Sequence, residues 1–197
     1  MEEIKAPFLN YQKLREISQC FREEHCLKNI VPTPIEEIIE SKFGIDIVPI
    51  PGLQKVIEAE AFLSSDMTTI SIDQFTYENR ENRYRFSLAH ELAHVILHKE
   101  IFKNIDCNDI QEWKKSRKII PKREHDLMEM QANNLAGLIL VPPEPLLLYF
   151  QEELKRNIAS NYENDVVVYL ISEELSQRFL VSREVVKIRI EKDALLK

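Results

Sequence analysis

The chain has 197 residues, of which 44% are hydrophobic and 30% are charged, a balance that is ordinary for a folded soluble protein. Its net charge of −7 argues against a large basic surface for nucleic acid. No apolar run reaches the ~20 residues that a membrane span needs, and no signal-peptide pattern is visible at the start. Three cysteines, Cys20, Cys26 and Cys107, lack metal-binding spacing, so we expect reduced thiols and a cytoplasmic location.

The first third of the chain predicts two helices and then three short strands. Apolar residues recur at helical spacing in both helices, and they alternate with polar residues in the first strand. The second helix begins at Thr33-Pro34 and ends at Gly44, because a capping residue followed by proline favours a helix start and glycine favours a helix end. In chain order we expect helices over 9–28 and 33–43 and strands over 45–50, 56–63 and 69–73.

The rest of the chain predicts helices on either side of a basic segment. A strong apolar stripe indicates a helix over 81–99. Residues 100–122 show no clear period, and we interpret them as a solvated connecting loop, with a lid over the active site as the alternative. Further helices are expected over 123–140, 146–155, 165–179 and 182–194. The pattern divides the chain into a domain over 1–145 and a helical C-terminal segment over 146–197.

The helix over 81–99 contains the motif His90-Glu91-Leu92-Ala93-His94. Two histidines four residues apart project from the same helix face, so their neutral imidazoles can bind one Zn²⁺ at about 2.0–2.1 Å. Glu91 points too far around the helix to be an equal ligand. It can instead take the proton of a zinc-bound water that attacks a peptide bond, and later give it to the departing amine. The alternative is an amphipathic helix with two surface histidines.

Catalytic zinc needs a third protein ligand and one open position. Glu129, on the next strongly predicted helix, is the expected ligand, with an ordinary exposed charge as the alternative. We expect Asn133, one turn later, to hydrogen-bond the non-metal nitrogen of a ligand histidine, unless it is an ordinary surface residue. His98 continues the histidine series and His125 lies one turn before Glu129, and both are weaker candidates for the metal. Mn²⁺ and Fe²⁺ are not excluded.

Two blocks of the sequence resemble the signatures of the ImmA/IrrE metallopeptidases: residues 85–98 (RFSLAHELAHVILH) and residues 129–142 (EMQANNLAGLILVP). The resemblance covers about residues 10–145. It departs from the family pattern at Ala93 and Leu135, where many members have glycine and phenylalanine, and neither change touches the chemistry.

This resemblance implies an α+β, zincin-like fold in which a small mixed or antiparallel sheet packs on the histidine-bearing helix, with a C-terminal helical segment. It also implies that His90, His94 and Glu129 bind zinc and that Glu91 is the general base. Members of the family typically act on repressor proteins, often helix-turn-helix regulators.

We therefore expect a zinc-dependent endopeptidase that cleaves a transcriptional repressor or a similar regulatory protein. The alternative is a non-catalytic zinc-binding regulator that captures such a partner, although a pure binder has no need of Glu91. The substrate is expected to lie along an exposed strand edge such as Thr69–Asp73. Tyr77, Tyr84 and Arg85 are the candidates for stabilising the oxyanion.

The C-terminal segment is similar to a helix-turn-helix module over residues 175–189. Its basic residues are nearly cancelled by glutamates, and phosphate contacts dominate affinity for DNA. We therefore expect this segment to pack or to dock a partner rather than to bind DNA. The sequence does not indicate the oligomeric state.

Overall fold

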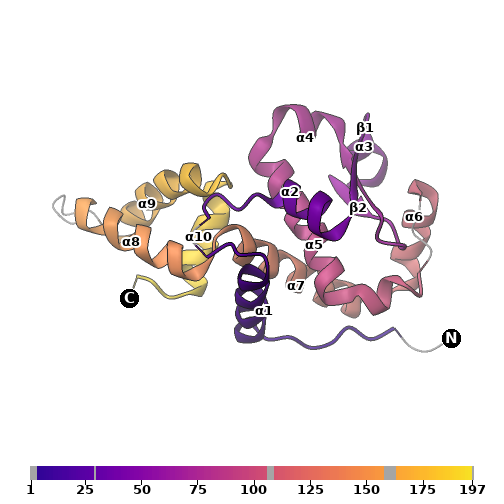
Figure 1. Cartoon of the computed structure of the whole chain (residues 1–197), viewed down its shortest axis with the longest axis horizontal. Helices are drawn as coiled ribbons and strands as arrows, with labels where there is room; N and C mark the ends of the chain where they lie inside the picture. Colours follow the sequence, from indigo (N-terminus) through magenta and orange to yellow (C-terminus); the bar gives the residue numbers. More distant parts are fainter. Residues whose placement is uncertain (1–3, 29, 106–108, 158–162, 197) are drawn as a thin grey trace.

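The computed structural model describes residues 4–28, 30–105, 109–157 and 163–196. Within them a small three-stranded sheet lies among many helices, which confirms the expected α+β fold (Figure 1). Cys20 and Cys26 are exposed free thiols, whereas Cys107 lies outside the described residues. Among the described helices, none has the length and apolar character of a membrane span.

The elements follow one another along the chain in two groups. The first group is α1 (Tyr11–Glu24), α2 (Ile35–Ile38), the π-helical turn η1 (Ile39–Phe43), β1 (Asp46–Ile50), α3 (Leu53–Ile57), β2 (Ala61–Leu63) and β3 (Thr69–Asp73). The second group is α4 (Gln74–Asn79), α5 (Glu81–Phe102), α6 (Ile110–Ile119), α7 (Lys122–Leu140), α8 (Pro143–Asn157), α9 (Asn164–Phe179) and α10 (Arg183–Lys192).

The strand predicted over 56–63 is wrong over residues 56–60, because 56 and 57 belong to helix α3 and 58–60 form a bend. Leu53 and Ile57, four residues apart, are both buried and form a small second core with Phe62. Left-handed backbone at Gly52 (φ 70°) and Glu58 (φ 58°) brackets this short helix. Tertiary burial therefore sets a helical period there, and only the last three residues join the sheet.

The loop interpretation of residues 100–122 is also wrong, because helix α6 occupies residues 110–119. The Asp109 carboxylate accepts hydrogen bonds from the backbone N–H groups of Gln111 and Glu112, at 2.7 and 2.8 Å. A carboxylate in this position caps a helix start. Among the basic side chains expected here, those of Lys114, Arg117 and Lys118 lie outside the described residues.

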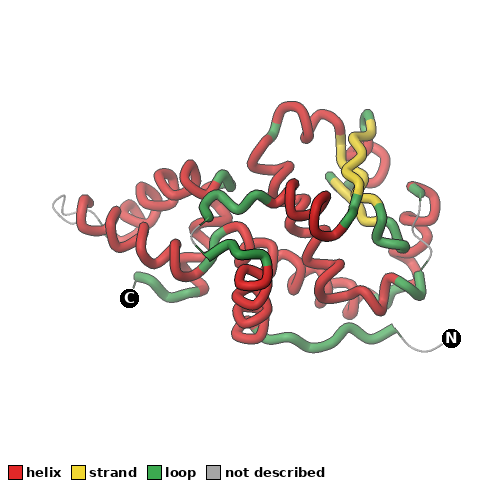
Figure 2. The backbone as a smooth tube through the Cα atoms, viewed as in Figure 1, coloured by secondary structure: helices red, strands yellow, loops and turns green. Residues whose placement is uncertain are grey.

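The sheet has the strand order β1-β3-β2, with β1 parallel and β2 antiparallel to β3. It is seen nearly edge-on beside α5 (Figure 2). Strand β3 is central and pairs on both sides, so Asp73 lies opposite Ile50 while Ile72 lies opposite both Pro49 and Ala61. The prediction that Thr69–Asp73 offers a free edge to a substrate is therefore wrong. The open edges belong to β1 and β2.

Helices α5 and α7 form the most extensive helix pair of the fold. Four alanines, Ala89 and Ala93 on α5 and Ala132 and Ala136 on α7, are fully buried. Small side chains on both helices let the two backbones approach closely. The residues beside these alanines, which include the predicted metal ligands, are consequently brought next to one another.

Helices α8 to α10 pack at the opposite end from the sheet (Figure 1), and their buried residues belong to the same core as those of α5 and α7. Leu180, with φ 50°, turns the chain between α9 and α10, and Ser182 caps α10 by accepting a hydrogen bond from the Val185 N–H. Arg85 of α5 donates to the carbonyl oxygens of Thr33 and Leu180 at 2.7 and 3.0 Å. The boundary placed at residue 145 stays a prediction.

Candidate metal centre

Two histidines of α5 and one glutamate of α7 point their polar atoms at a common position. The Nε2 atoms of His90 and His94 lie 3.1 Å apart, and the Glu129 carboxylate oxygens lie 3.3 Å from the first and 3.5 Å from the second. A tetrahedral zinc ion with bonds of about 2.0–2.1 Å holds its ligand atoms about 3.3 Å from one another. Among the described residues, these three form the one group of potential metal ligands of this kind. The donor set and its spacing fit a divalent metal.

Charge in this cluster is arranged around an ionised carboxylate. Burial opposes the charge of Glu129, but hydrogen bonds from His90 and His94 outweigh it and hold the pKa of Glu129 well below its usual range. Burial lowers the pKa of His94 to about 4, which keeps this ring neutral at neutral pH. Burial also opposes the charge of His90, yet its hydrogen bond to Glu129 and the negative charges of Glu91 and Glu129 leave its pKa raised. A cation is therefore favoured between these three side chains.

Glu91 lies one residue along from His90 and is only 8% exposed. Burial, together with the charge of Glu129, raises the pKa of its carboxyl to about 7, against the opposing effects of His90 and of the backbone N–H of Leu63. An acid whose pKa lies near the working pH is suited to accept and return a proton.

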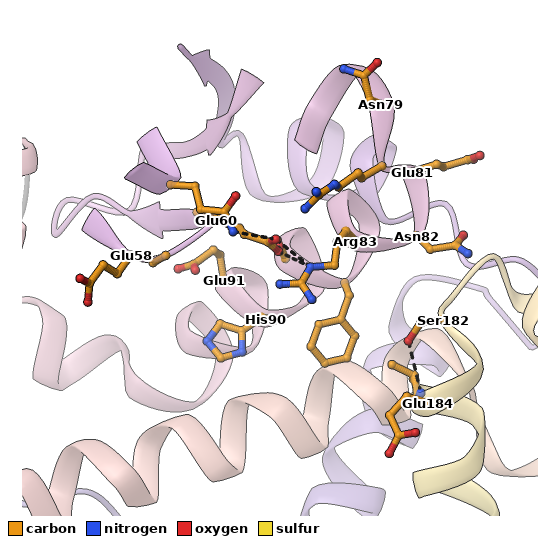
Figure 3. A pocket seen from close by; sticks show the side chains of 17 residues that line it. Glu58, Glu60, Asn79, Glu81, Asn82, Arg83, His90, Glu91, Ser182 and Glu184 are labelled. Atoms are coloured by element: carbon orange, nitrogen blue, oxygen red, sulfur yellow. Dashed lines mark hydrogen bonds and ion pairs between the residues drawn. The ribbon is translucent and has the colours of Figure 1, made fainter. Parts of the chain in front are cut away.

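Two cavities adjoin this cluster and share His90 and Glu91 in their walls. The larger one, about 850 Å³, lies between residues 58–61, the start of α5 and the start of α10. Figure 3 shows His90 and Glu91 at one side of it, the Arg83–Glu60 ion pair in the middle, and Ser182 and Glu184 at the far side. The smaller one, about 250 Å³, lies over Glu129 and is lined largely by apolar side chains.

A family model described as Peptidase_M78, IrrE N-terminal-like domain, matches residues 40–191. The chain belongs to this family. In fold, this IrrE-like chain is similar to a solved structure named Mycobacterium tuberculosis transcriptional regulator, with a TM-score of 0.55 and 18% sequence identity. That match covers 90% of this chain and 55% of the regulator, so the IrrE-like chain spans about half the regulator's length. No curated protein matches the chain.

Polar side chains contact the Nδ1 atoms of His90 and His94, on the side of each ring away from the metal position. Asn133, one turn beyond Glu129, places its Oδ1 atom 3.2 Å from Nδ1 of His90. His98 does not face the metal position, because its Nδ1 atom lies 3.1 Å from Nδ1 of His94. His125 lines the smaller cavity, with its Nε2 atom 3.9 Å from the Glu129 carboxylate.

Sequence reasoning missed Gln131 as a residue of this site. Its Oε1 atom lies 2.9 Å from Nε2 of His98, and its side chain is fully buried. No motif or spacing signals such a contact, because it joins α5 to α7 across their interface.

The three candidates for stabilising an oxyanion are not brought to this site. The Arg85 guanidinium donates from Nε and from one terminal nitrogen, Nη2, to backbone carbonyls of other segments. Tyr84 is buried against Tyr77, with ring centroids 5.1 Å apart. Among the described residues that line the two cavities, none of these three occurs. Their nearness in sequence reflects positions earlier on α4 and α5, away from the face that carries the histidines.

Proposed function

We propose that this IrrE-like chain is a zinc-dependent endopeptidase in which His90, His94 and Glu129 hold the metal and Glu91 is the general base. Membership of a peptidase family supports the reaction class. The observation that carries the proposal is the buried Glu91 carboxyl, with its pKa raised to about 7, directly beside a complete set of three ligands. When bound, zinc supplies a Lewis acid that polarises the peptide carbonyl and makes a water molecule more acidic.

The role of Glu91 follows from its position and its pKa. Its carboxylate accepts the proton of the water whose oxygen adds to the peptide carbonyl carbon. The same proton then passes to the amide nitrogen as the carbon–nitrogen bond breaks, so that a carboxylic acid and an amine result and Glu91 is again ionised. Because Glu91 is only 8% exposed, its contact with bulk water is limited to the cavities that it lines.

The part of β2 at Ala61 that faces away from β3 is the proposed docking position for an extended substrate, and the Leu63 N–H on the same edge is hydrogen-bonded to the Glu91 carboxyl. Residues 58–63 line the cavities on either side of Glu91. Because Glu60 O and Ser64 N bond to β3, the alternation of an antiparallel pair turns the backbone groups of Ala61 away from β3. The other edge of the sheet contains Pro49, which lacks an N–H group, so that edge offers no donor to a further strand at this position. A substrate strand is therefore best accommodated at β2.

The smaller cavity indicates the kind of side chain that fits beside the cleaved bond. Phe62, Phe102, Ile105 and Met128 make its walls apolar, and its volume is about 250 Å³. We propose a protein substrate with a large apolar residue at this position. A transcriptional regulator is the proposed substrate, supported by the family resemblance in the two sequence blocks.

The decisive experiment compares wild type with Glu91→Gln on a helix-turn-helix repressor encoded beside the gene. We expect wild type to contain zinc by elemental analysis and to cut the repressor. Glu91→Gln is expected to keep the zinc and to lose cleavage by about 10²-fold or more, because it cannot take up the proton. Glu58→Gln, a change in the wall of the same cavities, serves as the matched control and should cut normally. Cleavage by zinc-loaded Glu91→Gln at the wild-type rate would exclude Glu91 as the base.

A further inference from the structure

A chain of three hydrogen bonds runs from the metal-binding face of α5 to the N-terminal segment. His94 Nδ1 lies 3.1 Å from His98 Nδ1, His98 Nε2 lies 2.9 Å from Gln131 Oε1, and Gln131 Nε2 donates to the carbonyl oxygen of Pro7 at 2.6 Å. The three side chains are buried, with exposed fractions of 4% for His94, 1% for His98 and 0% for Gln131. The two inner contacts are therefore shielded from competing water, whereas the outer contact with the exposed Pro7 is only part-buried.

The donor and the acceptor of each of these three hydrogen bonds follow from the bond to the Pro7 carbonyl. A carbonyl oxygen can only accept, so Gln131 must turn its NH₂ group towards Pro7 and its oxygen towards His98. That oxygen in turn requires a proton on Nε2 of His98. A neutral imidazole carries one proton, so Nδ1 of His98 has a lone pair and must accept from Nδ1–H of His94. The remaining nitrogen of His94, Nε2, is then left as a bare lone pair on the metal side.

This arrangement matters because His94 has a second tautomer, in which the proton is on Nε2 instead of Nδ1. The carboxylate of Glu129 lies 3.5 Å from Nε2 of His94 and would accept a proton from it. A ring protonated at Nε2 cannot bind a metal through that atom. The two acceptors, His98 on one side and Glu129 on the other, thus compete for the same proton.

We propose that Pro7, Gln131 and His98 form a tautomer relay that holds His94 with its Nε2 lone pair free for the metal. The relay is defined by these three residues, and it rests on the metal site of the proposed function. Gln131 and His98 are positioning residues in it, because they act on the metal only through His94. The relay also ties the N-terminal segment to the metal site, where Ala6 N–H donates to the Glu124 carboxylate of α7 at 2.8 Å and fixes the neighbouring Pro7 carbonyl.

Two substitutions of similar size at residue 131 separate the relay from simple packing. Gln131→Glu keeps an acceptor for His98 Nε2–H, although it loses the donor to Pro7. Gln131→Met keeps the apolar bulk and removes the acceptor. If Gln131 only fills space, methionine is the milder change, because a buried carboxylate costs stability. If the relay operates, Gln131→Glu instead binds zinc more tightly than Gln131→Met.

Zinc affinity is measured by competition with a chromophoric chelator at pH 8, on full-length protein, without any substrate. We expect Gln131→Met and His98→Leu to bind Zn²⁺ about 10- to 100-fold more weakly than wild type, as loss of a partner behind a ligand histidine typically does. Gln131→Glu should stay within about threefold. His98→Asn, which can present an oxygen near the former Nδ1 position, should recover most of the affinity that His98→Leu loses.

Ring nitrogen chemical shifts of the metal-free protein provide a readout that does not depend on zinc. We expect His94 to carry its proton on Nδ1 in wild type and in Gln131→Glu, and to shift it towards Nε2 in Gln131→Met and His98→Leu. A His94 proton that stays on Nδ1 in all four proteins, or a methionine variant that binds zinc as tightly as wild type, would overturn the relay. Wild type that binds no zinc would refute it too. Wild type that binds zinc but cuts no protein would defeat only the peptidase assignment.

Discussion

The Nε2 atoms of His90 and His94 face each other at 3.1 Å, with the Glu129 carboxylate beside both. Two nitrogen lone pairs at this distance repel each other unless a positive charge lies between them. In the metal-free chain a proton on His90 can provide that charge, and although burial opposes it, the hydrogen bond to Glu129 and the charges of Glu91 and Glu129 raise the pKa of His90. A metal ion has to displace that proton before it can bind.

Zinc binding should therefore release a proton, and its affinity should rise with pH below the pKa of His90 by about tenfold per pH unit for each proton displaced. Bound zinc should also stabilise the fold, by about 2.7 kcal/mol at a free concentration of 100 times Kd. Thermal unfolding with and without Zn²⁺, at several pH values, measures both effects. The double variant His90→Ala/His94→Ala should show no zinc-dependent shift, and a wild-type shift that is independent of pH would contradict the displacement.

Glu91 makes the metal-free protein less stable at neutral and higher pH. Folding raises the pKa of this acid from 4.5 to about 7 by burial, so the folded chain binds more protons than the unfolded chain between these pH values. Stability must then fall as pH rises from about 4.5 to about 7, by at most about 3 kcal/mol, and stay reduced above it. Glu91→Gln carries no such penalty.

We therefore expect metal-free Glu91→Gln to be more stable than metal-free wild type at pH 8, with a difference that shrinks towards pH 4.5. Urea unfolding in the presence of a chelator measures it. Glu58→Gln, in the wall of the same cavities, is the control and should show no such pH-dependent gain. A Glu91→Gln variant that is equally or less stable at pH 8 would show that folding does not raise the pKa of this carboxyl.

The sequence was sufficient to predict the elements that carry strong local signals. The spacing of His90 and His94 predicts their common helix face, and Gly44 and Ser182 mark a helix end and a helix start where the structure has them. The convergence of Glu129 on those histidines is a tertiary relationship. It was anticipated because catalytic zinc needs a third protein ligand, and the family resemblance implies the same residue.

Other features could not be predicted because they depend on contacts between distant segments. Helix α3 forms because Leu53 and Ile57 seal a small core against Phe62, which overrides the strand-like composition around residue 56. The position of β3 between two other strands is set by pairing and has no signature in its own sequence. Gln131 and His98 meet only because α5 and α7 pack together.

Arg85 joins α5 to the turn before α10, and its loss should destabilise the whole fold. Its guanidinium donates to Thr33 O at 2.7 Å and Leu180 O at 3.0 Å. Arg85→Met removes both charge-assisted bonds while keeping the apolar stem, and we expect a loss of about 2–4 kcal/mol in the free energy of unfolding by urea. Arg83→Met is the matched control, because Arg83 is 60% exposed and its ion pair with Glu60 contributes under about 1 kcal/mol. Equal losses in both variants would count against a special role for Arg85.

The edge of β2 offers the sharpest test of how a substrate is held. If a substrate strand pairs with β2, the N–H of Ala61 is one of the groups it uses, because this N–H points away from β3. Ala61→Pro removes that donor at an edge position where proline is tolerated. Ala61→Ser keeps the donor with a side chain of similar size.

We expect Ala61→Pro to lower kcat/KM for the repressor by about tenfold or more, which corresponds to the loss of one backbone hydrogen bond and the disturbed docking of its neighbours. Zinc affinity should be unchanged, since Ala61 is not one of the three ligands, and this binding also reports that the fold is intact. Ala61→Ser should cut at close to the wild-type rate. A proline variant that binds zinc and cuts as fast as wild type would place the substrate elsewhere, because a substrate strand cannot pair fully with β2 when the N–H of residue 61 is missing.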